Sequence, residues 1–182
     1  MRTADADLLI IPGLGGSGPD HWQTRWEQKL STARRVEQRD WEKAERDEWV
    51  PAIVSAIHAA TRPVILIAHS LGVIAAIHAA RDTAPWVKGA FLVAAPSEER
   101  LAGVADADPA FRPFPRDTLP FPSALVASRD DTYADFAQSE ALARDWGAKL
   151  IDAGLAGHIN AASGHGPWPE GLLQFAAFMK RI

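Results

Sequence analysis

The sequence predicts a three-layer α/β sandwich, with a six-stranded parallel sheet between two layers of helices. Six short apolar runs alternate with longer segments of helical periodicity, the pattern of a parallel sheet covered on both faces. The length of 182 residues suits one domain, residues 1–182, and such a chain buries roughly 70% of its unfolded surface. No internal repeat or low-complexity tract interrupts the alternation.

The expected strands are the apolar runs. Continuous rather than alternating apolar residues indicate strands that are buried on both faces. We expect the strands to lie in the order 2-1-3-4-5-6, counted along the chain. They are residues 8–12, 34–39, 64–68, 90–94, 124–128 and 149–152.

The expected helices are residues 19–31, 47–60, 70–81, 134–146 and 170–180. Pro19 is suited to be the first residue of the first helix. In the last helix one apolar stripe is expected to face the core, formed by Leu172, Leu173, Phe175, Ala176 and Met179. The proline-rich residues 96–122 are too long for an ordinary connection. They are expected to form a solvated loop, a short lid, or a small helix plus a loop.

Composition excludes several classes of function. The net charge is −4 and the chain has no run of basic residues, so we do not expect it to bind nucleic acid. The chain has no cysteine, which excludes disulfides and thiolate catalysis. Residues 1–7 lack a signal-peptide pattern, and no apolar run approaches the ~20 residues needed to span a bilayer. We therefore expect a cytoplasmic protein with no membrane partner.

A serine lies in a turn between a predicted strand and a predicted helix. Residues 64–68 lead into His69-Ser70-Leu71-Gly72, and an apolar helical stretch follows at once. This is the context of the nucleophile elbow of α/β-hydrolases, in which small residues lie two before and two after the serine. Gly72 fits, and Ala68 occupies a position where glycine is commoner. The alternative interpretation is that Ser70 only caps the helix.

An acid and a base follow Ser70 in the order that such a hydrolase requires. A serine hydroxyl needs a neighbouring base, and the usual order is serine, then Asp or Glu, then His, after successive strands. Residues 124–128 are followed by Asp130 and Asp131, and residues 149–152 by His158. We predict a triad of Ser70, Asp131 and His158. Asp130 remains the alternative acid, and either aspartate could instead cap the next helix.

Five other histidines compete with His158 for the role of base. His165 is the main alternative, in a glycine-rich turn after it. His58 and His78 lie within predicted helices, where surface or core-edge roles are expected. His69 adjoins Ser70, so its side chain should point away from the serine. His21 opens the first helix and could border the site, although a packing role is favoured.

The glycine-rich loop at residues 12–18 follows the first strand. In a hydrolase it supplies one backbone N–H of the oxyanion hole, and the residue after the nucleophile supplies the other. The predicted donors are Leu14 and Leu71. The spacing of Gly13, Gly15 and Gly18 also matches a dinucleotide fingerprint, with Asp40 at the distance of a ribose-binding acid. A helix that begins at Pro19 would leave the glycines outside it, which disfavours dinucleotide binding.

The chain resembles the retinoblastoma-binding-protein-9/YdeN family of small serine hydrolases over nearly its whole length. The tryptophan-bearing segments and the His-Ile-Asn run are more specific than the serine turn. The matching segments are Pro12-Gly13, Gly18-Pro19-Asp20-His21-Trp22, Trp26, Asp40-Trp41, Trp49, Ala68-His69-Ser70-Leu71-Gly72, Ala95-Pro96-Ser97, Leu119-Pro120-Phe121-Pro122, Ser128-Arg129-Asp130-Asp131, Trp146-Gly147-Ala148, Gly157-His158-Ile159-Asn160 and Ser163-Gly164-His165-Gly166-Pro167-Trp168-Pro169.

The resemblance implies a minimal α/β-hydrolase fold without a large cap, and a triad at Ser70, Asp131 and His158. Family members usually carry Asp-Pro where this chain has Asp131-Thr132, so the choice between Asp130 and Asp131 stays open. The retinoblastoma-binding motif needs a cysteine, so that partner does not carry over. The expected function is hydrolysis of small carboxylic esters, with no metal or organic cofactor. The alternative is a binding or regulatory protein on a hydrolase scaffold.

Overall fold

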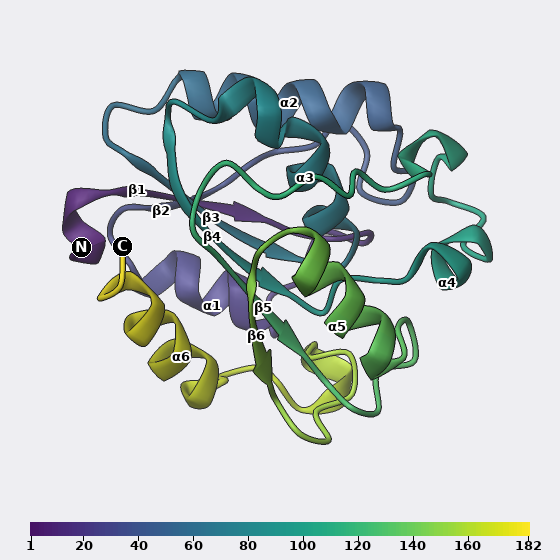
Figure 1. Ribbon diagram of the computed structural model, residues 1–182. Coiled ribbons are helices and arrows are strands. Elements are labelled where there is room, and N and C mark those ends of the chain that lie inside the picture. Colours follow the sequence, from purple (N-terminus) through teal and green to yellow (C-terminus); the bar gives the residue numbers. More distant parts are fainter.

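The computed structural model describes residues 1–182, and its six strands form one parallel sheet in the order β2-β1-β3-β4-β5-β6 (Figure 1). This is the predicted order, and every neighbouring pair is parallel. The strands are β1 (Asp7–Ile11), β2 (Ala33–Arg35), β3 (Val64–His69), β4 (Val87–Val93), β5 (Ser123–Ala127) and β6 (Lys149–Asp152). The α-helices are α1 (Trp22–Lys29), α2 (Arg46–His58), α3 (Leu71–Thr83), α4 (Glu98–Ala102), α5 (Phe136–Asp145) and α6 (Pro169–Met179). Three short 3-10 helices are η1 (Thr3–Asp5), η2 (Pro109–Phe111) and η3 (Ala161–Ser163).

The sheet has an apolar core on each face, because successive strand residues point to opposite sides. Leu9 and Leu66 belong to the core covered by α2, α3 and α5. Leu8 and Ile65 belong to the core covered by α1 and α6. Figure 1 shows α2 and α3 above the sheet and α1 and α6 below it. The three-layer α/β sandwich is therefore confirmed.

Most element boundaries differ from the prediction by one to four residues, and two of the larger differences have a clear cause. β2 ends at Arg35 rather than at residue 39, because its only neighbour, β1, ends at Ile11. α1 begins at Trp22 rather than at Pro19. Residues 18–20 form a turn that the His21 N–H closes onto the Gly18 carbonyl, and His21 then caps the helix.

The predicted core stripe of α6 is wrong in part. The helix buries Gly171, Phe175, Phe178 and Met179, a stripe with the spacing of one helix face. Leu172, Leu173 and Ala176 lie outside this stripe and are exposed, Leu172 by 42% and Leu173 by 72%. No helix of the structure combines the length and the apolar character needed to cross a membrane.

Residues 96–122 form a small helix plus a loop, one of the three predicted alternatives. Ser97 caps α4 by accepting the N–H of Arg100. The rest of the segment is anchored by buried apolar side chains that join the α2–α3–α5 core, namely Leu101, Ala107, Phe111, Phe114, Leu119 and Phe121. The segment therefore packs on the sheet face as a fixed part of the fold.

Candidate active site

A cavity of about 510 Å³ opens where loops from the carboxyl ends of the strands meet, the usual place for a site in a parallel sheet. The loop after β1, the Ser70 turn after β3, Tyr133 after β5 and His158 after β6 all line it. Pro96, Leu101 and Val104 also line it; they come from α4 and the residues on either side of it, 96–104, which we call the α4 segment. None of the side chains lining the cavity is a lysine or an arginine, and Asp20 is the one acid.

Ser70 lies between β3 and α3 in a strained turn. Its φ is +54°, a backbone conformation that residues other than glycine rarely adopt. The Ser70 N–H donates to the Val93 carbonyl at 3.0 Å. The turn packs so closely on the end of β1 that a Cβ at Gly72 would meet the carbonyl oxygens of Ile11 and Pro12. This contact explains why glycine is needed two residues after the serine.

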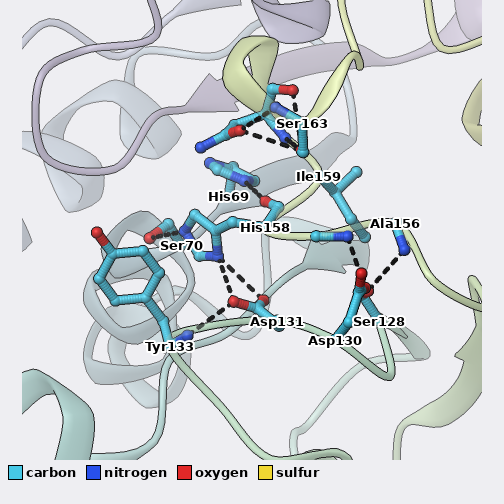
Figure 2. Close-up of polar contacts among 12 residues, drawn as sticks. His69, Ser70, Ser128, Asp130, Asp131, Tyr133, Ala156, His158, Ile159 and Ser163 are labelled. Carbon is cyan, nitrogen blue, oxygen red and sulfur yellow. Dashed lines mark hydrogen bonds and ion pairs between the residues drawn. The ribbon is translucent and has the colours of Figure 1, made fainter.

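The structure brings Ser70, His158 and Asp131 together in one hydrogen-bonded chain (Figure 2). His158 Nε2 lies 2.8 Å from Ser70 Oγ. His158 Nδ1 lies 2.9 Å and 3.0 Å from the two carboxylate oxygens of Asp131. The side chains of His158 and Asp131 are 10% and 3% exposed. An imidazole held in this way carries its proton on Nδ1 and leaves Nε2 free to accept the serine proton.

Asp130, the alternative acid, faces other groups. Its Oδ1 accepts the Ser128 hydroxyl at 2.7 Å and the Gly157 N–H at 2.8 Å. The bond from Ser128, followed by that from Gly157, lowers the pKa of Asp130 from its ordinary value. Asp130 therefore links the loop after β5 to the loop that carries His158, and only Asp131 reaches the imidazole.

The other candidate bases lie elsewhere or play other roles. His165 contacts Ser163 Oγ at 3.3 Å and has no hydrogen bond to Ser70. His58 packs on Trp86. His78 Nε2 donates to the Phe111 carbonyl at 3.0 Å.

Two buried histidines, His21 and His69, adjoin His158 and line the cavity, so His21 borders the site, one of the two roles expected for it. His69 Nε2 lies 2.9 Å from the His158 carbonyl, and the ring of His21 lies 4.8 Å from that of His69. Burial lowers the pKa of His21 to about 4 and lowers the pKa of His69 well below 6.5. Both rings are therefore uncharged at neutral pH.

The glycine-rich loop lies directly beside the serine. A Cβ at Gly13 would lie 2.9 Å from Ser70 Cβ and 3.3 Å from the Leu71 nitrogen. The backbone N–H groups of Leu14 and Leu71 donate no hydrogen bond within the protein, and both residues line the cavity. Two free amides beside a serine hydroxyl are the arrangement that can hold an oxyanion.

The same loop is held from outside by Arg35 and Trp41. The Arg35 guanidinium donates to the carbonyls of Gly16 and Ser17 and to the Thr24 hydroxyl. The Gly15 N–H donates to the Trp41 carbonyl at 2.8 Å. The loop ends before α1 begins, so no helix N-terminus lies within it, and Asp40 accepts the N–H groups of Glu42 and Lys43. Both observations disfavour the dinucleotide interpretation.

Known proteins share the sequence pattern and the fold. The family model described as "Serine hydrolase" matches residues 8–177. A YdeN-like hydrolase from Pectobacterium atrosepticum is 35% identical, with a TM-score of 0.87 over 98% of this chain and 92% of that one. The ydeN gene product of B. subtilis is 19% identical, with a TM-score of 0.71 over 95% of this chain and 98% of that one.

A third structure shares the fold at lower identity. Esterase 2 of Thermogutta terrifontis is 18% identical, with a TM-score of 0.71 over 100% of this chain and 85% of that one. A search of curated proteins found no match. The family match and the 35% identical hydrolase decide the assignment. The chain belongs to the serine hydrolase family and is a YdeN-like α/β-hydrolase.

Proposed function

We propose that this protein hydrolyses small carboxylic esters, with Ser70 as nucleophile, His158 as base and Asp131 as the acid that orients the base. The observation that carries the proposal is the continuous chain from Ser70 Oγ through His158 to Asp131, with contacts of 2.8 Å and 2.9 Å. A serine hydroxyl within 3 Å of an imidazole that a carboxylate orients is the arrangement of an activated nucleophile.

The reaction would run in two halves. His158 Nε2 takes the Ser70 proton as Oγ attacks the ester carbonyl, and the Leu71 and Leu14 amides hold the oxyanion. The imidazolium then protonates the leaving alcohol, which departs and leaves an acyl group on Oγ. Water, deprotonated by the same imidazole, releases the acid and restores the serine. Asp131 keeps the proton on Nδ1 and stabilises the imidazolium.

The cavity supports a small, uncharged ester as substrate. Its volume of about 510 Å³ lies in the usual range for small-molecule sites. Apolar side chains from α4 and the glycine loop line it, and it offers no cationic side chain to a substrate carboxylate or phosphate. Esterase 2 of Thermogutta terrifontis, which shares the fold, has a form with propionate bound.

A chain-length series of p-nitrophenyl esters tests the substrate class. We expect kcat/KM to be highest for short acyl chains, because the cavity of about 510 Å³ has room for a small acyl group only, and Pro96, Leu101 and Val104 of the α4 segment take up part of its lining. Activity that peaks with long acyl chains would contradict the proposal.

A fluorophosphonate probe tests the residues. We expect it to label the wild type and the His165→Ala variant, and to fail with Ser70→Ala and His158→Ala. Labelling of Ser70→Ala would exclude Ser70 as the nucleophile. An unlabelled, inactive wild type would favour a binding role on a hydrolase scaffold.

A further inference from the structure

The turn that carries the His158 imidazole is strained. Ile159 has a φ of +48°, and a β-branched residue in this region is a genuine outlier. Gly157, on the other side of His158, has a φ of +55°. The Ile159 side chain is fully buried, so the turn cannot relax without disturbing the core. Strain of this kind persists only where surrounding groups hold the backbone in place.

Two buried donors from different elements hold this turn. His69, at the end of β3, contacts the His158 carbonyl at 2.9 Å (Figure 2). Trp22, the first residue of α1, donates its indole N–H to the Ile159 carbonyl at 2.9 Å. Both side chains are nearly or fully buried, at 4% and 0% exposure. Consecutive carbonyls of the strained turn are therefore each held by one side chain.

The chemistry of the partners fixes the role of His69. A carbonyl oxygen only accepts hydrogen bonds, so His69 Nε2 carries the proton and donates it. His69 also precedes Ser70 directly in the chain. One dipeptide therefore contacts His158 twice, since Ser70 meets the imidazole ring and His69 meets the carbonyl of the same residue.

We propose that His69 is a positioning residue, which holds the strained His158–Ile159 turn through its Nε2–H and so keeps the His158 imidazole within hydrogen-bond distance of Ser70. This inference rests on the proposed function for its effect on activity. The structural part, that His69 fixes the His158 loop, does not depend on the substrate.

Two variants separate the hydrogen bond from packing. His69→Phe keeps a planar ring but removes the donor, whereas His69→Gln keeps an N–H donor at a similar reach. His78→Phe is the matched control, because His78 also donates Nε2–H to a carbonyl, that of Phe111, and does not line the active-site cavity. The readouts are kcat and KM for a p-nitrophenyl ester, and the tautomer of the His158 imidazole by ¹⁵N NMR.

We expect His69→Phe to lower kcat by about 10- to 100-fold with little change in KM, the size of loss that a small misplacement causes. We expect His158 in this variant to lose its single Nδ1–H tautomer, because a turn that is no longer held displaces the ring from Asp131, which fixes that tautomer. His69→Gln should recover most of kcat, and His78→Phe should match the wild type.

Two results would overturn the proposal. One is wild-type kcat and a single His158 tautomer in His69→Phe. The other is equal impairment of His69→Phe and His69→Gln, which would assign His69 to packing. Ester hydrolysis that survives in Ser70→Ala would refute the proposed function instead, and the tautomer of His158 would then decide the role of His69 alone.

Discussion

Asp130 and Asp131 are neighbours in the chain, but their carboxylates have different partners. Asp131 accepts from the His158 ring and from the Tyr133 N–H, at 2.9 Å each. Asp130 accepts from Ser128 and from the Gly157 N–H. The ring of Tyr133 also lies 4.5 Å from that of His158, so the loop after β5 contacts the imidazole with two residues. A single-atom change in each carboxylate separates the two roles.

We expect Asp131→Asn to lower kcat for a p-nitrophenyl ester by about 10³- to 10⁴-fold, because an amide can stabilise the wrong tautomer of His158. Asp130→Asn is the matched variant, and we expect a much smaller loss, since Asp130 supports the loop without touching the imidazole. Steady-state kinetics of both proteins check this. Equal losses, or a larger loss in Asp130→Asn, would reverse the assignment of the acid.

Arg35 is expected to influence catalysis from outside the cleft. Its guanidinium holds the carbonyls of Gly16 and Ser17, so Arg35→Met should loosen the loop that presents the Leu14 amide. We expect kcat to fall by about tenfold, less than the roughly 10²-fold or greater loss that removal of an oxyanion donor causes, because Arg35→Met only loosens the loop. Arg34→Met is the control, because Arg34 bonds only the Ala56 carbonyl in α2. Unchanged kcat in Arg35→Met would show that the loop holds its shape without the guanidinium.

At the scale of elements, the contact between the start of α3 and the end of β1 sets the serine turn. The Cβ of an alanine at position 72 would lie 2.8 Å from the Pro12 carbonyl carbon, and backbone cannot move aside as a flexible side chain can. We expect Gly72→Ala to lower the free energy of unfolding by about 3 kcal/mol or more, the upper end of overpacking losses.

Urea unfolding of Gly72→Ala measures this loss in the free energy of unfolding, with Gly18→Ala as the control variant. A Cβ at Gly18 meets nothing within 4 Å, so we expect that variant to stay within about 1 kcal/mol of the wild type. A Gly72→Ala protein as stable as the wild type would show that α3 can shift away from β1.

The sequence predicted the elements well and their ends poorly. A strand such as β3 is buried on both faces and is therefore apolar throughout, so an uninterrupted apolar run in the sequence is enough to locate it. The end of β2 depends on where β1 ends, and the start of α1 depends on a hydrogen bond between His21 and Gly18. These are contacts that no local pattern contains.

The same distinction holds for the site. The order of Ser70, Asp131 and His158 after successive strands follows from the fold class, so the sequence could place all three at one edge of the sheet. His69 and Trp22 act on carbonyls of residues far along the chain, with sequence separations of 89 and 137. Such pairings depend on the tertiary structure. From the apolar residues around His69 and Trp22, the sequence could indicate only that the two side chains are buried.

At the scale of the whole molecule, the buried neutral histidines make stability depend on pH. The pKa of His21 is about 4 in the folded protein against 6.5 ordinarily, so between these values the unfolded chain binds the additional proton. Stability is therefore full above about pH 6.5 and declines as the pH falls towards 4. For His21 alone the loss approaches about 3 kcal/mol, and His69 adds a loss of the same sign.

Urea unfolding at pH 7 and pH 4.5 tests this dependence. His21→Asn keeps an acceptor at the N-cap of α1 but does not titrate, so we expect a smaller loss of stability in this variant. Asp130 affects stability at lower pH. Its pKa in the folded protein is below the ordinary 3.8, so its contribution to stability is present above about pH 3.8 and is lost as the pH falls further. An unchanged pH dependence in His21→Asn would show that other groups cause the acid destabilisation.

The strained backbone at Ile159 has a consequence for how such an enzyme responds to selection. Backbone strain in this turn lowers the free energy of unfolding. Sequence changes that relieve the strain would therefore make the protein more stable and, at the same time, a poorer catalyst. Selection for heat resistance without a demand for turnover should therefore accumulate replacements around residues 157–159 early. Thermostable descendants obtained in this way would keep the sheet intact and lose the hydrolytic reaction first.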